Sequence, residues 1–247
     1  MFESRVNFAA SRSPTVSTPP ARFPLGVERL DAALCGGLTR ARLHELYPAE
    51  ADDAACAAGF AVMLALRAGG RGSPFVWISE DRLERRFGHL HAPGVAELGA
   101  DPARWLFVDA PDEKALLRIA ADVVRSPAAG IAVIAPAGPA PNFDLTATRR
   151  LTLFAERSGV TAILLRSCAP QAPSAAATRW RVAAAPSTPL DADAPGHPAL
   201  LVELERQRGG APVPAMRVEW QRDSQCFATP LPGDLAAVPS GGFLAAG

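Results

Sequence analysis

Apolar and polar positions along the chain follow two periods, one typical of strands and one typical of helices. Five short apolar runs predict buried strands: 43–47, 74–79, 104–109, 130–135 and 161–166. Three longer stretches have apolar residues at helical spacing and predict helices: 53–67, 112–125 and 144–158. Asp144 is placed to cap the last helix, and Gly159 to end it. This alternation predicts an α/β fold, a mostly parallel sheet with helices on both faces.

Helical spacing ends after residue 177, and the apolar segments that follow predict only strands. They lie at 178–184, 199–207, 214–222 and 224–228. Short turns separate them, so we expect antiparallel C-terminal strands that extend the main sheet. Both ends of the chain lack a sustained period and are rich in small residues and proline. The pattern therefore predicts a flexible arm (1–21), a core (22–185), a β extension (186–229) and a flexible tail (230–247).

Composition narrows the classes of partner and site. The 247 residues include 25 Lys and Arg and 25 Asp and Glu, so no net charge draws the chain to DNA or an acidic membrane. We expect any contact with DNA to come through partners or a local patch. The sequence has no apolar run of about 18 residues and no signal peptide, which predicts a cytoplasmic protein without a membrane helix. The four cysteines and four histidines show no ligand-like spacing, so no metal site is predicted.

Residues 24–47 carry the most specific signal in the sequence. A short helix with Leu30 and Leu34, a Gly36-Gly37 turn and a strand that contains Glu45 follow one another. This order of elements and residue types resembles the entrance to the RecA-type ATPase core, where the strand leads into a phosphate-binding loop. The resemblance implies a RecA-like fold, and it extends more weakly over about 160 residues.

The phosphate-binding loop of that family has the form G-x-x-x-x-G-K-[ST]. Its backbone amides and lysine hold phosphate, and its hydroxyl group binds Mg²⁺. The matching stretch of this chain has Pro48 and Asp53 at the glycine positions, and Ala54 and Ala55 at the lysine and hydroxyl positions. Asp52 and Asp53 would repel phosphate, whereas carboxylates suit the N-terminus of a helix. We therefore expect these two acids to cap the helix at 53–67.

The other parts of an ATPase site are also missing. The single lysine of the chain, Lys114, lies on a different predicted helix. The strand that should end in an acid for Mg²⁺ ends in Ala135 instead. Glu80 and Asp81 stand where RecA-like proteins keep the carboxylate that activates water, but without nucleotide we interpret them as an acidic cap between strand and helix. The sequence thus predicts a protein that is not an enzyme and that holds no cofactor.

A RecA-like core with a degenerate phosphate loop, two tails and many arginines but few lysines resembles the ImuA family. The segments L-L-V-E-L-E-R (200–206) and M-R-V-E-W (216–220) match its C-terminal pattern. The resemblance implies an accessory role in damage-induced (SOS) mutagenesis, in support of translesion synthesis. It implies an ImuB-like Y-family polymerase homologue as partner, with RecA and an error-prone DnaE-type polymerase as further candidates. The alternative is a SulA-type inhibitor that binds the cell-division GTPase, since SulA is also RecA-like and lacks the loop.

Arg179, Trp180 and Arg181 alternate basic and aromatic groups after a Pro/Ala-rich break. In RecA the loop before the corresponding strand contacts single-stranded DNA, and arginine with an exposed tryptophan suits phosphate binding and base stacking. These residues are therefore candidate contacts to DNA. Strand alternation gives the other interpretation, in which Trp180 is buried and the two arginines face solvent.

Two further pairs are candidate contacts to a partner or DNA. Arg206 and Arg208 precede a glycine turn, but glutamates are interleaved with nearby arginines, which favours a charge ladder across strands on a solvated face. Phe243 and Ala246 in the tail have the F-x-x-A form that docks on RecA-fold cores in some relatives. These four residues complete the set of candidate contacts.

Overall fold

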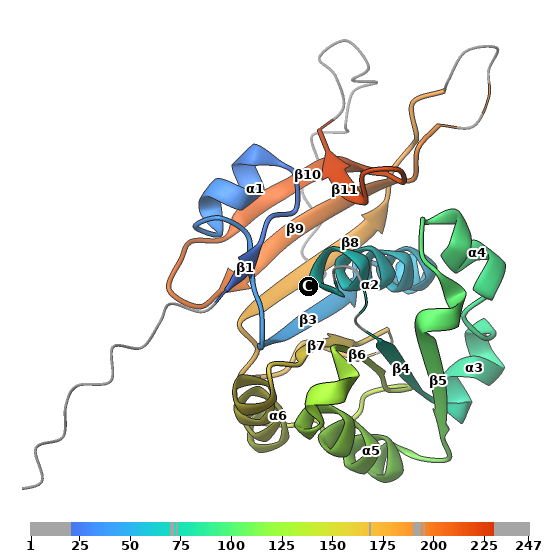
Figure 1. The fold of residues 1–247 in the computed structure, drawn as a ribbon, viewed down its shortest axis with the longest axis vertical. Coiled ribbons are helices and arrows are strands. Elements are labelled where there is room, and N and C mark those ends of the chain that lie inside the picture. Colours follow the sequence, from blue (N-terminus) through green and yellow to red (C-terminus); the bar gives the residue numbers. More distant parts are fainter. Residues whose placement is uncertain are drawn as a thin grey trace, which may run out of the picture.

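The computed structural model describes residues 21–69, 72, 74–167, 169–189, 194 and 196–229. The arm and tail expected at the two ends, with Phe243 and Ala246, lie outside these residues, apart from Ala21. A ribbon of β1 (Arg22–Phe23) and β2 (Leu38–Thr39) precedes one nine-stranded sheet (Figure 1). The sheet strands are β3 (Leu43–Pro48), β4 (Phe75–Glu80), β5 (Trp105–Ala110), β6 (Ile131–Ala135), β7 (Thr161–Leu165), β8 (Thr178–Ala184), β9 (Ala199–Gln207), β10 (Val213–Gln221) and β11 (Cys226–Ala228).

Helices connect most of the parallel strands of this sheet. They are α2 (Ala54–Gly69), α3 (Asp81–Phe87), α4 (Ala92–Glu97), α5 (Glu113–Arg125) and α6 (Leu145–Ser158), whereas α1 (Glu28–Ala33) lies between β1 and β2. Single 3-10 turns are η1 (Ala51–Asp53), η2 (Pro102–Arg104) and η3 (Pro127–Ala129). Where the sequence predicted helices, local chemistry explains their bounds. Asp144 accepts a hydrogen bond from the amide of Ala147 at 2.7 Å and caps α6, and Gly159 ends α6 with a φ of 85°.

The strand order is β11-β10-β9-β8-β3-β7-β6-β4-β5. The strands from β8 to β5 in this order run parallel to their neighbours, and β9, β10 and β11 pair antiparallel with theirs. Parallel neighbours need crossovers, and α2, α5 and α6 lie in these connections. The arrangement is RecA-like, an α/β fold with an antiparallel extension, so the fold class predicted from the sequence is confirmed.

The hydrophobic core has two layers, one on each side of the sheet. One layer packs α1 and α2 against residues such as Leu46 and Trp180, and the other packs α5 and α6 against residues such as Leu43 and Ile134. Figure 1 shows α2 over β3 and β8, with α5 and α6 on the opposite side of the sheet. Neighbouring residues of β3 point into different layers, as strand alternation requires. The expectation of helices on both faces is therefore confirmed.

Most predicted elements lie within two residues of their observed bounds, and the differences are local. The sequence prediction omitted the β1–β2 ribbon and α4, and it gave no bounds for the helix expected after Glu80 and Asp81, which is α3. The last strand begins at Cys226, two residues later than expected, because the preceding residues form a turn in which Gln225 has a φ of 47°. Gly37 allows the close approach of β1 and β2, since a Cβ atom at this position would lie 2.1 Å from the carbonyl oxygen of Phe23.

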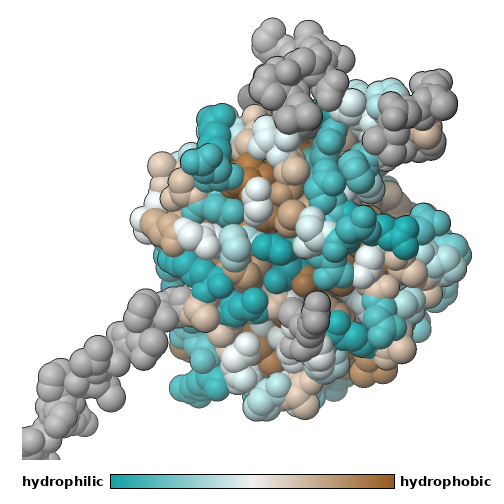
Figure 2. All heavy atoms as spheres, turned by 45° about the horizontal axis from the view of Figure 1, so that its top comes forward, coloured by the Kyte–Doolittle hydropathy of each residue, from teal (hydrophilic) through white to brown (hydrophobic). Residues whose placement is uncertain are grey.

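The described surface is mixed rather than strongly apolar. On the face drawn in Figure 2, hydrophobic side chains form small spots between hydrophilic ones. The large apolar side chains that are exposed are Phe87, Leu106, Phe107, Leu145 and Leu153. Two of these, Leu106 and Phe107, are neighbours on β5, the last strand at one edge of the sheet. No helix in the described part of the chain has the length and apolar character to span a bilayer.

Candidate functional site

The segment between β3 and α2 occupies the place of the phosphate-binding loop, and it is closed by its own side chains. Glu50 and Asp53 bond to each other across η1: the amide of Asp53 donates to the carbonyl oxygen of Glu50 at 3.1 Å, and Asp53 Oδ2 accepts from the amide of Glu50 at 3.1 Å. The other oxygen, Asp53 Oδ1, accepts from the amide of Ala184 at 2.8 Å. The sequence predicted that Asp52 and Asp53 cap the helix at 53–67. An acidic turn does stand at its start, but Glu50 and Asp53 form it around η1, one turn before α2, and Asp52 is exposed.

A second contact fastens this segment to the sheet. The amide of Ala49 donates to the carbonyl oxygen of Val182 at 2.7 Å, so the chain beyond β3 continues along β8. The residues at the former lysine and hydroxyl positions, Ala54 and Ala55, form the first turn of α2. Lys114, the only lysine in the sequence, lies in α5, which packs on the opposite face of the sheet from α2. The segment has the structure of a helix cap tied to a neighbouring strand.

The two other positions that carry ATPase chemistry in RecA-like proteins, the end of β6 and Glu80, are buried in this chain. β6 ends at Ala135, which is fully buried, and the residue after it is Pro136, so no acid follows this strand directly. Glu80 is also buried, and its carboxylate accepts from the amide of Ala137 at 3.1 Å. Glu80 stands at the N-cap position of α3 but makes no capping bond with its side chain. The expectation that it caps the helix is therefore wrong: Glu80 joins the end of β4 to the segment after β6.

A buried carboxylate, Glu45 on β3, organises the sheet next to the closed loop. Its Oε1 accepts from Nε of Arg166 at 3.1 Å, and its Oε2 accepts from Nη2 of Arg179 at 3.1 Å and from Oγ of Ser174 at 2.5 Å. Arg166 also donates from Nη2 to the carbonyl oxygen of Phe143 at 2.6 Å. Both arginines compensate the buried charge of Glu45, so they hold the segments after β7 against β3 and β8.

The basic and aromatic triplet on β8 has its tryptophan in the core. Trp180 is fully buried and donates from Nε1 to Oγ1 of Thr178 at 2.9 Å. The interpretation with an exposed, stacking tryptophan is therefore wrong. Burial of Trp180 is confirmed, but only Arg181 matches the expected solvated arginine. The side chain of Arg179 is 12% exposed and pairs with Glu45.

The remaining candidate arginines lie on the same side of the sheet as Arg179. Nη2 of Arg206 donates to Oγ of Ser174 and to the carbonyl oxygen of Ala176, both at 3.2 Å. Arg208 is exposed and donates from Nη2 to the carbonyl oxygen of Ala175 at 3.2 Å. These arginines brace the irregular segment before β8, and their contact with a partner or DNA stays a prediction.

The expected charge ladder is present in part. Arg181 on β8 pairs with Glu205 on β9, with Nη2 and Oε1 2.5 Å apart, and Nε of Arg181 lies 4.0 Å from Oε2 of Glu203. Arg217 and Glu219 on β10 also pair, at 2.7 Å, but both residues are less than a tenth exposed. The ladder across strands is thus present between β8 and β9, whereas the pair on β10 is buried and lies within one strand.

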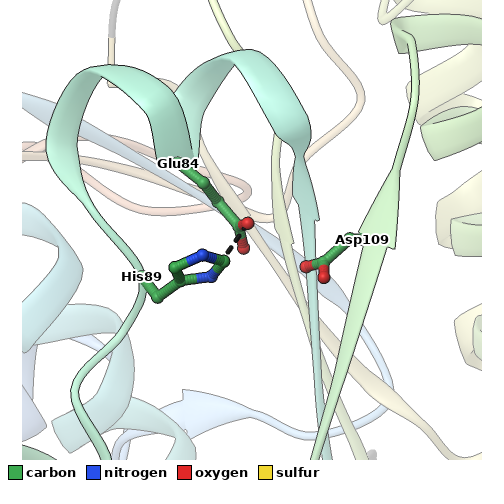
Figure 3. Close-up of side chains that lie close together, drawn as sticks. All are labelled: Glu84, His89 and Asp109. Carbon is green, nitrogen blue, oxygen red and sulfur yellow. Dashed lines mark ion pairs between the residues drawn. The ribbon is translucent and has the colours of Figure 1, made fainter.

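The structure brings together three ligand-type side chains that the sequence does not indicate. Glu84 of α3, His89 after this helix and Asp109 of β5 place one donor atom each within 4.8 Å of one another (Figure 3). Nδ1 of His89 lies 2.9 Å from Oε2 of Glu84, and Ser79 donates to Oε1 of Glu84 at 2.8 Å. Burial raises the pKa of the Glu84 carboxyl group, and the neighbouring Asp109 raises this pKa as well. The hydrogen bond from Ser79 lowers it. No spacing could indicate this cluster, because Asp109 comes from another strand.

A largely apolar cavity of about 470 Å³ lies beside this cluster and extends to the first turns of α2. Glu84 and His89 line it on one side, and Ala54, Ala55 and Gly59 of α2 line it on the other. A second hollow, of about 340 Å³, is lined by residues 48–51 together with side chains that include Arg86 and Arg166. The region at the start of α2 is therefore accessible.

Comparison with known proteins identifies the family. No family model matches the chain. The chain is 34% identical over 210 residues to Protein ImuA of Caulobacter vibrioides strain NA1000, and the match covers 79% of this chain and 82% of that protein. Protein ImuA of the Caulobacter vibrioides strain CB 15 gives the same identity and coverage. This identity and coverage show an evolutionary relationship, and the RecA-like architecture described above agrees with it. The chain belongs to the ImuA family.

Proposed function

We propose that the protein is a non-catalytic scaffold that supports damage-induced mutagenesis by binding other proteins of translesion synthesis. One observation carries the proposal: both carboxylate oxygens of Asp53 are engaged, one by Glu50 and one by the amide of Ala184. A phosphate group would have to displace these bonds and would meet two carboxylates without a lysine. The fold therefore supplies a rigid frame instead of a nucleotide site.

Membership of the ImuA family suggests which proteins the scaffold binds. ImuA relatives lead us to propose an ImuB-like Y-family polymerase homologue as the direct partner, with RecA and an error-prone DnaE-type polymerase as further partners. The chain reaches DNA through these proteins. This agrees with its zero net charge and with the internal partners of Arg179, Arg206 and Arg208.

The free edge of the sheet is the surface that best suits a protein partner. β5 pairs only with β4, so one side of this strand has no neighbour among the described strands. Leu106 is 59% exposed and Phe107 is 41% exposed on the same strand. An unpaired strand with exposed apolar side chains binds an extended segment of another chain through backbone hydrogen bonds. We propose this edge as the site where the partner docks.

Co-purification without nucleotide tests the proposal. The chain is expressed with the ImuB-like protein, RecA and the division GTPase of its own genome, one at a time. We expect stable co-elution with the ImuB-like protein, reduced by Leu106→Glu and Phe107→Glu. Leu153→Glu is the matched control, because Leu153 is 42% exposed on α6, away from the edge. Capture of the division GTPase alone would contradict the proposal and favour the SulA-type alternative.

A further inference from the structure

We propose that Glu84, His89 and Asp109 form a binding site for a divalent transition-metal ion, with Zn²⁺ as the ion that fits the three ligands best. The site shares strand β5 with the proposed docking edge, but metal binding is measured without any partner, so the test of this site is independent of the proposed function. It lies where α3, the turn after it and the edge strand β5 meet (Figure 3).

The geometry of the three side chains suits one small cation. Figure 3 shows the Glu84 carboxylate between the imidazole of His89 and the carboxylate of Asp109, all three directed toward a common point. Their donor atoms lie within 4.8 Å of one another. A zinc ion binds nitrogen and oxygen at about 2 Å, which places its ligands roughly 3 to 4 Å apart. Small side-chain rotations therefore suffice to bring the three atoms to bonding distance.

The types of ligand select the class of ion. An imidazole with two carboxylates suits Zn²⁺ and similar transition-metal ions, whereas Mg²⁺ and Ca²⁺ prefer oxygen ligands alone. Three protein ligands leave a fourth tetrahedral position for water or for a donor atom of a bound molecule. Glu84 and His89 also line the 470 Å³ cavity, so this position is reached from an open space.

The pair of carboxylates also favours a divalent ion. Donor atoms of Glu84, His89 and Asp109 lie within 4.8 Å of one another. Two carboxylates this close either share a proton or hold a positive charge between them. Glu45 provides the contrast, because Arg166 and Arg179 flank that buried carboxylate at 3.1 Å each. A divalent ion would supply at Glu84 the compensation that the two arginines supply at Glu45.

The local backbone holds the ligands in place. Ser79, at the end of β4, donates to Oε1 of Glu84 at 2.8 Å and leaves Oε2 facing His89. Such an outer hydrogen bond orients a metal-binding carboxylate. Gly88 has a φ of 81°, which favours glycine, and this turn returns His89 toward the helix that carries Glu84. A bound ion would link α3 and the turn after it to β5, and so fix one wall of the cavity.

Calorimetric titration of Zn²⁺ into the metal-free, untagged full chain tests the site. We expect one saturable equivalent and, for the zinc-loaded protein, a higher melting temperature. Glu84→Gln, His89→Asn and Asp109→Asn should each weaken binding by at least about tenfold, as loss of a ligand requires. His91→Asn is the matched control, since His91 lines the same cavity but lies outside the cluster. It should leave the affinity unchanged.

Absence of saturable binding, or equal affinity in the wild type and all three cluster variants, would overturn the proposal. So would binding that is lost in Cys35→Ser but kept in the cluster variants, because Cys35 is an exposed thiol with its own affinity for zinc. His89 and Asp109 are exposed, so their variants are expected to fold even where Glu84→Gln does not. The visible spectrum of the Co²⁺-loaded protein provides a second readout, which should change in His89→Asn and stay constant in His91→Asn.

Discussion

The carboxylate of Asp53 accepts a hydrogen bond from the backbone amide of Ala184 at 2.8 Å and thereby ties the start of α2 to the end of β8. The same side chain accepts from the amide of Glu50 at 3.1 Å. In a phosphate-binding loop this position is a glycine, and the backbone around it faces the nucleotide. In this chain an acid at that position stabilises the fold.

Replacement of Asp53 by Ala should lower the free energy of unfolding by about 1 to 2 kcal/mol, because one side chain satisfies two backbone amides. Urea denaturation followed by circular dichroism measures the change. Asp52→Ala is the matched control: Asp52 is exposed and adjacent, and its loss should cost at most about 0.5 kcal/mol. Equal effects of the two substitutions would mean that Asp53 acts only through its charge.

Replacement of Glu45 by Gln should be far more damaging, because it leaves the guanidinium groups of Arg166 and Arg179 without their shared carboxylate. Removal of one partner from a buried ion pair costs about 3 to 5 kcal/mol. Thermal unfolding measures the loss. Glu156→Gln serves as the control, since its pair with Arg42 is partly exposed and is worth up to about 1 kcal/mol. A Glu45 variant as stable as the control would contradict a structural role for this network.

His44 makes stability depend on pH. Burial lowers its pKa from the ordinary 6.5 to about 4, so the folded protein holds a neutral imidazole. The unfolded chain binds more protons between these two values, so the stabilisation is complete above pH 6.5 and is lost as the pH falls toward 4. The free energy of unfolding is therefore lower by roughly 3 kcal/mol at a pH below 4 than at a pH above 6.5. Denaturation across this range should show the slope in the wild type and lose most of it in His44→Gln.

The tautomer of His44 follows from its neighbours. Trp180 Nε1 is only a donor, and it donates to Oγ1 of Thr178 at 2.9 Å. The Thr178 hydroxyl then donates to Nδ1 of His44, 2.8 Å away, and Nε2 of His44 donates to the carbonyl oxygen of Thr39 at 2.9 Å. Protonation of Nδ1 would place a charge in this buried site and would stop the nitrogen from accepting the Thr178 hydroxyl, which is why acid destabilises the junction of β2, β3 and β8. An unchanged pH slope in His44→Gln would assign the slope to other groups.

The chain alone should not bind single-stranded DNA with measurable affinity at physiological salt. Its net charge is zero, Trp180 is fully buried and Arg179 pairs with Glu45. Fluorescence anisotropy of a labelled oligonucleotide tests this, with the chain alone and with its ImuB-like partner. Binding by the chain alone that Arg208→Ala abolishes would contradict indirect recruitment and assign the exposed Arg208 to DNA.

The sequence indicates the fold well because its strongest signals are local. Apolar runs and helical periods place β3 to β10 and the three long helices, and Asp144 and Gly159 mark the bounds of α6. The short helices α3 and α4 lack a period long enough to recognise. The β1–β2 ribbon has only two residues in each strand, and its pairing depends on a close approach at Gly37.

The candidate site was harder to predict, because its partners come from distant parts of the chain. The sequence shows that the phosphate loop lacks lysine and glycines, and it indicates an acidic cap. It does not show that Asp53 meets Ala184, that Glu80 binds the amide of Ala137, or that Asp109 reaches Glu84 and His89. Strand alternation correctly allowed a buried Trp180, but the burial of Arg179 depends on Glu45 of the neighbouring strand.

The central claim, that the chain has exchanged its nucleotide site for a structural cap, is tested most directly by isothermal titration calorimetry with ATP. The full chain is titrated in the presence and absence of Mg²⁺, beside a RecA-type ATPase with an intact loop. The account predicts saturable binding by the intact ATPase and no saturable heat for this chain under either condition. Saturable, Mg²⁺-dependent ATP binding by this chain would contradict the account and return the protein to the class of nucleotide-binding RecA-like proteins.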